Sequence, residues 1–222
     1  MLSTRRPSRR LVWPGLLLVC AFGASVSPAA TPPKVLHFGN AVDPQDLDPQ
    51  SVTGVYEARI LRALLEGLVC SGTDMDVTPG VAKSWEISPD GLVYTFHLRA
   101  DARWTTGAAV TATDFVRSYR RLLTPSFGAP YADHFYYVAG AEAYHRGALR
   151  DFSQTGFKAL DPHTLQLTLH QPAPFLLNLM TRVEWLPVPM DVIERVGPAD
   201  RPGNRWTRPE HFVGNGAFLL SS

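Results

Sequence analysis

Hydrophobic and polar residues alternate most clearly between Trp85 and Leu98. Trp85 and Ile87 begin the alternation, and Ser88–Gly91 interrupts it with a proline and a glycine. Proline pre-sets φ and glycine accepts a positive φ, so this tetrapeptide predicts a hairpin turn. The pattern then resumes with four apolar side chains on one face, Leu92, Tyr94, Phe96 and Leu98. This period of two predicts a half-buried strand after the turn.

A helix is predicted directly after this hairpin. Trp104–Gly107 has the composition of a loop, and Thr111–Asp114 forms a capping-box-like start. An apolar stripe follows at helical spacing, and Thr124 before Pro125 marks the end, because the residue before proline avoids the helical region. The stripe consists of Phe115, Tyr119 and Leu122.

Weaker patterns predict the other elements. Apolar residues at helical intervals indicate helices over 56–68, 138–146, 175–180 and 191–196, and alternation indicates a strand over 165–169. A short strand is expected from Val35, and Gly67 and Gly147 are the expected helix ends. Asp74–Asp76 is expected to be a turn, because it lacks the glycine and the distant glutamate of a calcium loop.

Composition is that of an ordinary globular protein. The chain has 222 residues, 45% hydrophobic and 18% charged, which fits one or two domains. Pro 19 and Gly 17 favour a turn-rich α+β protein over a helical bundle. Four of the 21 basic residues precede the expected cleavage point and no acidic residue does, which leaves 17 basic against 20 acidic residues. This balance of −3 argues against nucleic acid as a partner.

Residues 1–29 are expected to be a signal peptide. Arginines at 5, 6, 9 and 10 form a basic region, Leu11–Ala24 is apolar, and Ser27–Ala29 offers a small-residue cleavage site. The apolar run is shorter than the roughly 20 residues that a membrane-spanning helix needs. The sequence leaves Sec and twin-arginine export open. Val19 occupies a position where a lipoprotein signal wants a small residue, which argues against lipid anchoring through Cys20.

The sequence contains no recognisable catalytic or metal-binding motif. Its seven histidines include no i, i+4 pair with an adjacent glutamate, and it has no Gly-x-Ser-x-Gly elbow, phosphate loop or dinucleotide fingerprint. Cys70 is expected to be a packed apolar residue rather than a nucleophile, and Asp46 and Asp48 are expected to lie in a solvated turn. We therefore expect a protein that is not an enzyme and holds neither a cofactor nor a metal.

One long segment resembles a known family. The order PGVAKSWEISPDGLVYTFHLRADARWTTGAAVTATDFVRSYRRLLTP, from Pro79 to Pro125, is similar to the family 5 extracellular solute-binding proteins, the oligopeptide- and dipeptide-binding proteins of bacterial ABC importers. The family's order and spacing are matched by the Asp90-Gly91 turn, Phe96–Arg99, Trp104, Gly107 and Thr111–Phe115.

The resemblance implies an α/β fold of the periplasmic binding protein type, class II and cluster C. It implies that 30–65 begins the first lobe, that 66–189 is an inserted small α+β domain, and that 190–222 returns into the first lobe. Leu47–Pro49 matches the family's Leu-Asp-Pro element, Trp185–Pro189 its re-entry strand, and Val213–Leu220 a strand with an Asn-Gly turn. The second lobe would be missing, so the chain is expected to be a truncated form.

The resemblance also nominates site residues near the start of the chain. Thr53, Gly54 and Val55 match a segment that pairs its main chain with a bound peptide in the oligopeptide binders. From the residues alone, a tight turn is the favoured explanation of Gly54, and the resemblance shifts the expectation toward ligand contact. Arg62 matches a basic cleft position, and its alternative is a solvated helix face.

Three further candidates lie later in the chain. Tyr131 falls in Gly128–Ala132, which resembles the family's Ser-Pro-Tyr-Ala element with Ala129 in place of serine. A tyrosine offers a ligand an apolar face and a hydroxyl, or simply packs its ring. Arg182 and Trp185 precede the expected re-entry into the first lobe, and local packing and solvation are their alternatives.

The resemblance implies a function in peptide import. The protein would be a monomer that captures oligopeptides in the periplasm and delivers them to the membrane permease of an ABC importer. Three alternatives stay open: a binder of the same fold for a dipeptide, murein peptide, nickel complex or haem; a secreted hydrolase with its chemistry in the missing part; and a structural or signalling module that has lost its ligand.

Overall fold

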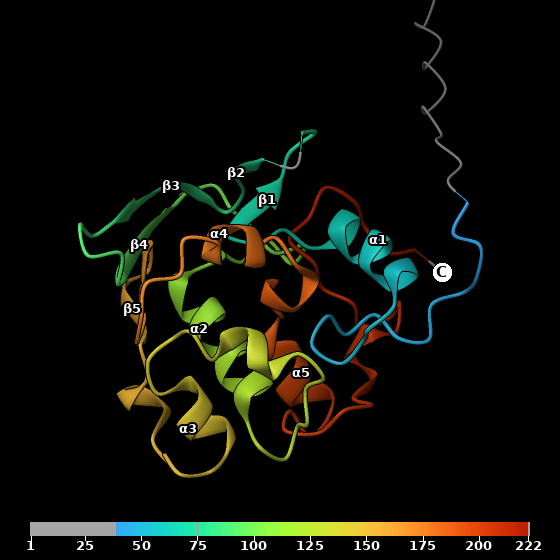
Figure 1. Cartoon of the computed structure of the whole chain (residues 1–222). Helices are drawn as coiled ribbons and strands as arrows, with labels where there is room; N and C mark the ends of the chain where they lie inside the picture. The colour runs from blue at the N-terminus through green and yellow to red at the C-terminus, as the bar shows by residue number, and fades with distance from the viewer. Residues whose placement is uncertain (1–38, 75, 222) are drawn as a thin grey trace, which may run out of the picture. The chain divides into compact units, whose positions relative to one another are not determined.

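The predicted hairpin forms one edge of a four-stranded antiparallel sheet (Figure 1). The computed structural model describes residues 39–74 and 76–221, so the expected signal peptide, Cys20 and the start of the strand from Val35 lie outside the described residues. The strand order is β3-β4-β6-β5, with bounds β3 Ala82–Ile87, β4 Val93–Leu98, β5 Phe157–Asp161 and β6 Thr164–Thr168. Gly91 closes the hairpin turn at φ 71°, which explains the glycine.

Burial in the sheet follows the predicted alternation. Tyr94, Phe96 and Leu98 of β4 are buried while the residues between them are half-buried, so this strand is confirmed. β6 is confirmed in the same way by Leu165 and Leu167. β5 was not predicted, because only the first of its five residues is buried and the exposed ones include a leucine. An edge strand with an apolar outer face carries no alternating signal.

The capped helix after the hairpin is also confirmed. α2 spans Ala112–Leu123, and the Asp114 carboxylate accepts hydrogen bonds from the Thr111 N–H at 2.7 Å and the Thr111 hydroxyl at 2.8 Å. The helix packs on β5 and β6 through its apolar stripe. Figure 1 shows α2 lying beside this sheet.

An aromatic core surrounds Tyr119 of α2. The ring centroids of Phe135 and Phe157 each lie 5.3 Å from that of Tyr119, and the ring of Trp185 lies 5.4 Å away. The Tyr119 hydroxyl donates a hydrogen bond to the Trp185 carbonyl at 3.2 Å, and burial raises the pKa of the phenol. This residue is therefore held as a neutral donor within the core.

The remaining elements are short. α1 spans Val55–Leu64, α3 Ala141–His145, α4 Leu176–Leu179 and α5 Met190–Val196, and a separate hairpin pairs β1 Val69–Ser71 with β2 Val77–Pro79. Single 3₁₀ turns lie at 132–135, 152–154, 183–185 and 205–207. None of the helices described is long and apolar enough to cross a membrane.

Two predicted helices end differently from the expectation. α1 stops at Leu64 rather than near Gly67, because Leu65 turns extended at φ −131° and ψ 147°. Leu65 and Leu68 are nevertheless buried. The leucines at helical spacing therefore extend past the end of the helix, because Leu65 and Leu68 in the following turn also pack into the core. α3 likewise covers only part of the expected 138–146.

The strands expected at Trp185–Pro189 and Val213–Leu220 are absent from the described chain. Trp185 instead ends a 3₁₀ turn. The later segment docks its backbone on the end of α1, where the Gly216 N–H donates to the Leu64 carbonyl at 3.0 Å. A Cβ on Gly216 would lie 2.6–2.7 Å from backbone atoms of residues 63–65, so only glycine allows this approach.

A buried ion pair joins α2 to the loop before α1. Arg121 donates to both Asp48 oxygens, at 2.6 and 3.2 Å, and the two side chains are only 1% and 2% exposed. The Trp206 indole N–H donates to the same carboxylate at 3.1 Å. The expectation of a solvated turn at Asp48 is therefore wrong, because Arg121 lies more than seventy residues away in the sequence and no local pattern reveals it.

The other donors of Arg121 are also satisfied by distant segments. Its Nε donates to the Ala199 carbonyl at 2.8 Å and its Nη1 to Gln50 Oε1 at 2.7 Å. Gln50 in turn donates to the Ser118 carbonyl at 2.8 Å. The ion pair thus fastens the loop at 48–50 and the segment at 199–206 to one helix.

We expect Asp48→Ala to lower the free energy of unfolding by about 3–5 kcal/mol, because it leaves a buried guanidinium without its counter-charge. Asp191→Ala is the matched control. Asp191 pairs with Arg117 on the same helix at 2.6 Å but its side chain is 77% exposed, so its loss should cost about 1 kcal/mol or less. Urea denaturation measures both, and equal losses would contradict this assignment.

We expect Gly216→Ala to destabilise the fold by about 1–3 kcal/mol, because the new methyl group meets backbone that cannot move aside. Gly197→Ala is the control: at φ 174° the backbone is extended, and a Cβ would find its nearest neighbour at 3.5 Å. Thermal unfolding should show a lower midpoint for the first variant only. An unchanged midpoint for Gly216→Ala would show that the segment is not docked on α1.

Candidate functional site

A cavity of about 160 Å³ gathers most of the residues expected at the site. Its walls come from three parts of the chain: the start of α1, the loop at Tyr131, and the turn before Trp185. The lining residues are Val52, Thr53, Gly54, Val55, Ala58, Arg62, Tyr131, Arg182, Val183 and Glu184. Six of the seven expected site residues therefore lie together, although they span 130 positions in the sequence.

The first wall is the N-terminal turn of α1. Gly54 is the residue before the helix, and its carbonyl accepts the first helical hydrogen bond, from the Ala58 N–H at 3.2 Å. The N–H groups of 55–57 therefore have no helical partner, as in every first turn. Val55 is 69% exposed beside them. This end of the helix can offer main-chain donors to a ligand carbonyl.

The structure explains why residue 54 is a glycine, which the sequence alone does not. Its backbone is extended, at φ −82° and ψ 147°, so no unusual conformation demands glycine. Instead, a Cβ would lie 1.8 Å from Oε2 of Glu57, which folds back over it. Glu57 also accepts a hydrogen bond from the Gln45 N–H at 3.1 Å through its other oxygen. The glycine makes room for a buried carboxylate at the start of the helix.

The opposite wall rests on a stack of three side chains, of which Tyr131 and Arg182 line the cavity and His134 lies behind them. The Tyr131 ring lies on His134, with centroids 5.2 Å apart and planes 14° apart, and the Arg182 guanidinium lies 5.3 Å from the Tyr131 centroid. Glu184 Oε1 accepts from Arg182 Nε at 2.7 Å and from His134 Nδ1 at 2.6 Å. One carboxylate oxygen therefore holds both ends of the stack and fixes Tyr131 between them.

Sequence reasoning missed Glu184. Its side chain is 2% exposed, and its second oxygen, Oε2, is enclosed without a hydrogen-bonding partner among the described residues. The available signal was a single acidic residue within the otherwise apolar run from Val183 to Pro189. Buried carboxylates are rare unless they are paired, so this position could have been flagged.

Trp185 does not belong to the cavity wall. Its side chain is buried in the aromatic core, with its ring stacked on Phe135 at a centroid distance of 3.9 Å. The indole nitrogen has no hydrogen-bonding partner in the described part of the chain. The surroundings of Trp185 in the described chain are therefore those of a core residue, which is the alternative given for it above.

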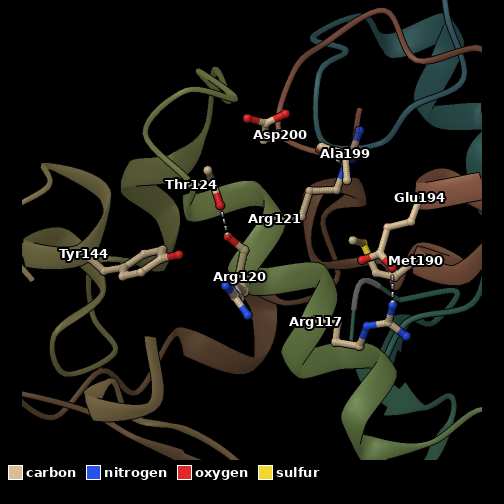
Figure 2. Close-up of a pocket in the computed structure, with 9 residues that line it drawn as sticks. All are labelled: Arg117, Arg120, Arg121, Thr124, Tyr144, Met190, Glu194, Ala199 and Asp200. Carbon is tan, nitrogen blue, oxygen red and sulfur yellow. Dashed lines mark hydrogen bonds and ion pairs between the residues drawn. The ribbon is translucent and has the colours of Figure 1, made fainter. Parts of the chain in front are cut away.

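A second cavity, of about 310 Å³, lies between α2 and α5 (Figure 2). Three arginines of α2 line it, which would suit an anion. Arg117, however, is paired with Asp191 at 2.6 Å and with Glu194 at 3.0 Å, and Arg121 is held by Asp48. Two of the three charges are therefore already used to hold the fold, so we do not assign this cavity as an anion site.

A family model matches most of the described chain. Residues 76–222 match the model for "Bacterial extracellular solute-binding proteins, family 5 Middle". The chain is 41% identical over 183 residues to the periplasmic oligopeptide-binding protein OppA of Escherichia coli, which covers 82% of this chain and 32% of that protein. It is 36% identical over 222 residues to the probable deoxycholate-binding periplasmic protein YgiS of the same organism, covering 96% and 40%.

Solved structures agree with the sequence relatives. The crystal structure of Haemophilus influenzae OppA in complex with RPPGFSPFR superposes with a TM-score of 0.76 at 38% identity, over 82% of this chain and 35% of that one. The murein tripeptide binding protein MppA of Escherichia coli gives 0.73 at 36% identity, over 81% and 34%. The expected fold class, a partial α/β fold of the periplasmic binding protein type, is confirmed. The chain spans about a third of the length of these proteins.

The chemistry of the described residues offers little to catalysis. No group of three or more histidine, cysteine or acidic side chains in the described ranges could hold a metal ion. Burial raises the pKa of the Cys70 thiol, and the negative charge of Glu66 raises it further. A raised pKa lowers the thiolate fraction at neutral pH, so Cys70 is a poor nucleophile.

We expect Cys70 to react with iodoacetamide at pH 8 more slowly in the folded chain than in the unfolded chain, because the raised pKa of its thiol lowers the thiolate fraction. The rate should rise as the pH increases toward 10. Mass spectrometry of the Cys70 peptide measures it, and the same chain unfolded in urea is the control. Reaction as fast as in the unfolded chain would contradict the assignment.

Proposed function

Because the chain belongs to the family 5 bacterial extracellular solute-binding proteins, we propose that it binds oligopeptides in the periplasm and passes them to the membrane permease of an ABC importer. The observation that carries this proposal is the convergence of Thr53–Val55, Arg62, Tyr131 and Arg182 on one cavity. Thr53–Val55, Arg62 and Tyr131 were each nominated by resemblance to the family, and Arg182 by its place before the expected re-entry into the first lobe. The named OppA relatives support the same ligand class.

Binding would begin with the peptide main chain. The free N–H groups at the start of α1 would donate to peptide carbonyls, and the Tyr131 hydroxyl and Arg182 would add donors from the opposite wall. Each such hydrogen bond contributes about 0.5–1.5 kcal/mol net. Main-chain contacts are indifferent to side chains, which would let one site accept many sequences.

The cavity in this chain is one side of the proposed site. A volume of about 160 Å³ accommodates a side chain or part of a peptide unit rather than a whole oligopeptide. The relatives are about two and a half times as long, and we propose that a second lobe closes over the ligand. Closure requires that the ligand bind the closed form more tightly than the open form. In this scheme 30–65 and 190–222 belong to the first lobe and 66–189 forms the small domain.

A second candidate ligand is a bile acid. The match to YgiS extends over 96% of this chain, and that protein is named as a probable deoxycholate binder. Val52, Val55, Ala58 and Val183 give the cavity apolar walls that a steroid could contact. The cavity's donors and charged groups favour a peptide, so deoxycholate serves as the competing ligand in the test.

We expect Tyr131→Ala to weaken peptide binding by about 1–2 kcal/mol, roughly tenfold in Kd, because the site loses the ring and hydroxyl between Arg182 and His134. Titration calorimetry with RPPGFSPFR on the full-length protein measures the change in Kd. Stability should fall by about 1 kcal/mol or less, since the ring is half-buried and the core does not depend on it.

Tyr137→Ala is the matched control. Tyr137 packs edge-on against Phe175 with ring centroids 5.1 Å apart and does not line the cavity, so its loss should leave the Kd unchanged. Equal affinity of wild type and Tyr131→Ala would remove Tyr131 from the site. Binding of deoxycholate and no binding of peptides would replace the proposed ligand class.

A further inference from the structure

The second oxygen of Glu184 is the least satisfied polar group in the wall of the site. Oε1 already accepts two hydrogen bonds, from Arg182 and His134, whereas Oε2 is enclosed and has no partner in the described chain. An ionised carboxylate has capacity for about four hydrogen bonds. Leaving a buried acceptor unpaired is unfavourable, and more so when the group is charged. Such a group in a native structure needs an explanation, and a donor supplied by a bound ligand is one.

We propose that Glu184 Oε2 is the specificity-determining acceptor for a cationic side chain, lysine or arginine, of the bound peptide. This inference rests on the proposed peptide-binding function. It names a residue that neither the motif nor the resemblance to relatives singled out, and it makes the site selective at one position of the ligand.

The shape of the cavity fits a long cationic side chain. Val52, Val55, Ala58 and Val183 form apolar walls, and Glu184 lies among them. Lysine and arginine have apolar stems that pack along such walls while the charged end reaches a partner. The cavity of about 160 Å³ has room for one stem of this kind. Glu184 itself lines this cavity, so the charged end of such a stem would meet its carboxylate.

The charges around the site are compatible with this ligand. Arg182 already balances one negative charge through Oε1, and Arg62 is exposed on α1, where solvent screens it. Glu57, also buried, adds a second carboxylate at the start of α1 beside Gly54. Arg182 offsets the charge of Glu184, and Glu57 leaves a second buried carboxylate near the cavity, which is compatible with one added cation.

Glu184→Gln tests the acceptor with almost no change of shape. The amide oxygen must face Arg182 and His134, because both donate to this position. The amide NH₂ is then left at the place of Oε2, which turns an acceptor into a donor. The variant should therefore reject a cation specifically and tolerate a neutral side chain of the same length.

The experiment compares the Kd values of Ala-Lys-Ala and Ala-norleucine-Ala by titration calorimetry on the full-length protein. We expect the wild type to prefer the lysine peptide about tenfold, as for a charge-assisted hydrogen bond, and Glu184→Gln to reduce this ratio to about one. Glu142→Gln is the control: Glu142 pairs with Arg146 on the surface and does not line the cavity, so the ratio should stay at its wild-type value. A merely structural role for Glu184 would weaken both peptides equally and leave the ratio unchanged.

The outcomes separate this inference from the proposed function. If both peptides bind the wild type with equal Kd, the function stands and the inference is overturned. If neither peptide nor RPPGFSPFR binds, the proposed function fails and the inference fails with it. A crystal structure with Ala-Lys-Ala gives an answer that does not depend on the variant folding. We expect the lysine Nζ at about 3 Å from Oε2, and a lysine that points elsewhere would overturn the assignment.

Discussion

The buried pair between Asp48 and Arg121 is the interaction on which the rest of the arrangement depends. Removing two charges from water costs more than their attraction returns unless further hydrogen bonds satisfy both groups. Here Trp206, Gln50 and the Ala199 carbonyl supply those bonds. Because the partners come from segments far apart in the chain, the pair is complete only when all of them are in place. We therefore expect the ion pair to contribute more to selecting this arrangement of segments than to the net free energy of folding.

The site inherits its geometry from the aromatic core. Phe135 and Trp185 stack at a centroid distance of 3.9 Å, and each is preceded in sequence by a residue of the hydrogen-bonded group that holds Tyr131 and Arg182. His134 precedes Phe135, and Glu184 precedes Trp185. The core stack thus holds His134 and Glu184 within hydrogen-bonding distance, and their contact fixes Arg182 and Tyr131 in turn. Trp185 supports the site from beneath rather than lining it.

Backbone docking places the other wall. The glycines at 214 and 216 bring the C-terminal segment against the end of α1, while Asp48 anchors the loop that leads into its start. α1 is therefore held at both ends, with its free N–H groups at the cavity. This arrangement suits a protein that recognises ligand main chain with one wall and ligand charge with the other.

The β3–β4 hairpin, the capped helix α2 and the family could be predicted from the sequence alone. Each rests on local signals: a proline-glycine turn, alternation, a capping box and a long ordered motif. It also nominated six of the residues that line the cavity. Only the tertiary structure decided the roles of Asp48, Gly54 and Glu184, the edge strand β5 and the docked segment at 213–216. In each case the deciding partner is a side chain or backbone that folds onto the residue from elsewhere, and no periodicity along the chain records such a contact.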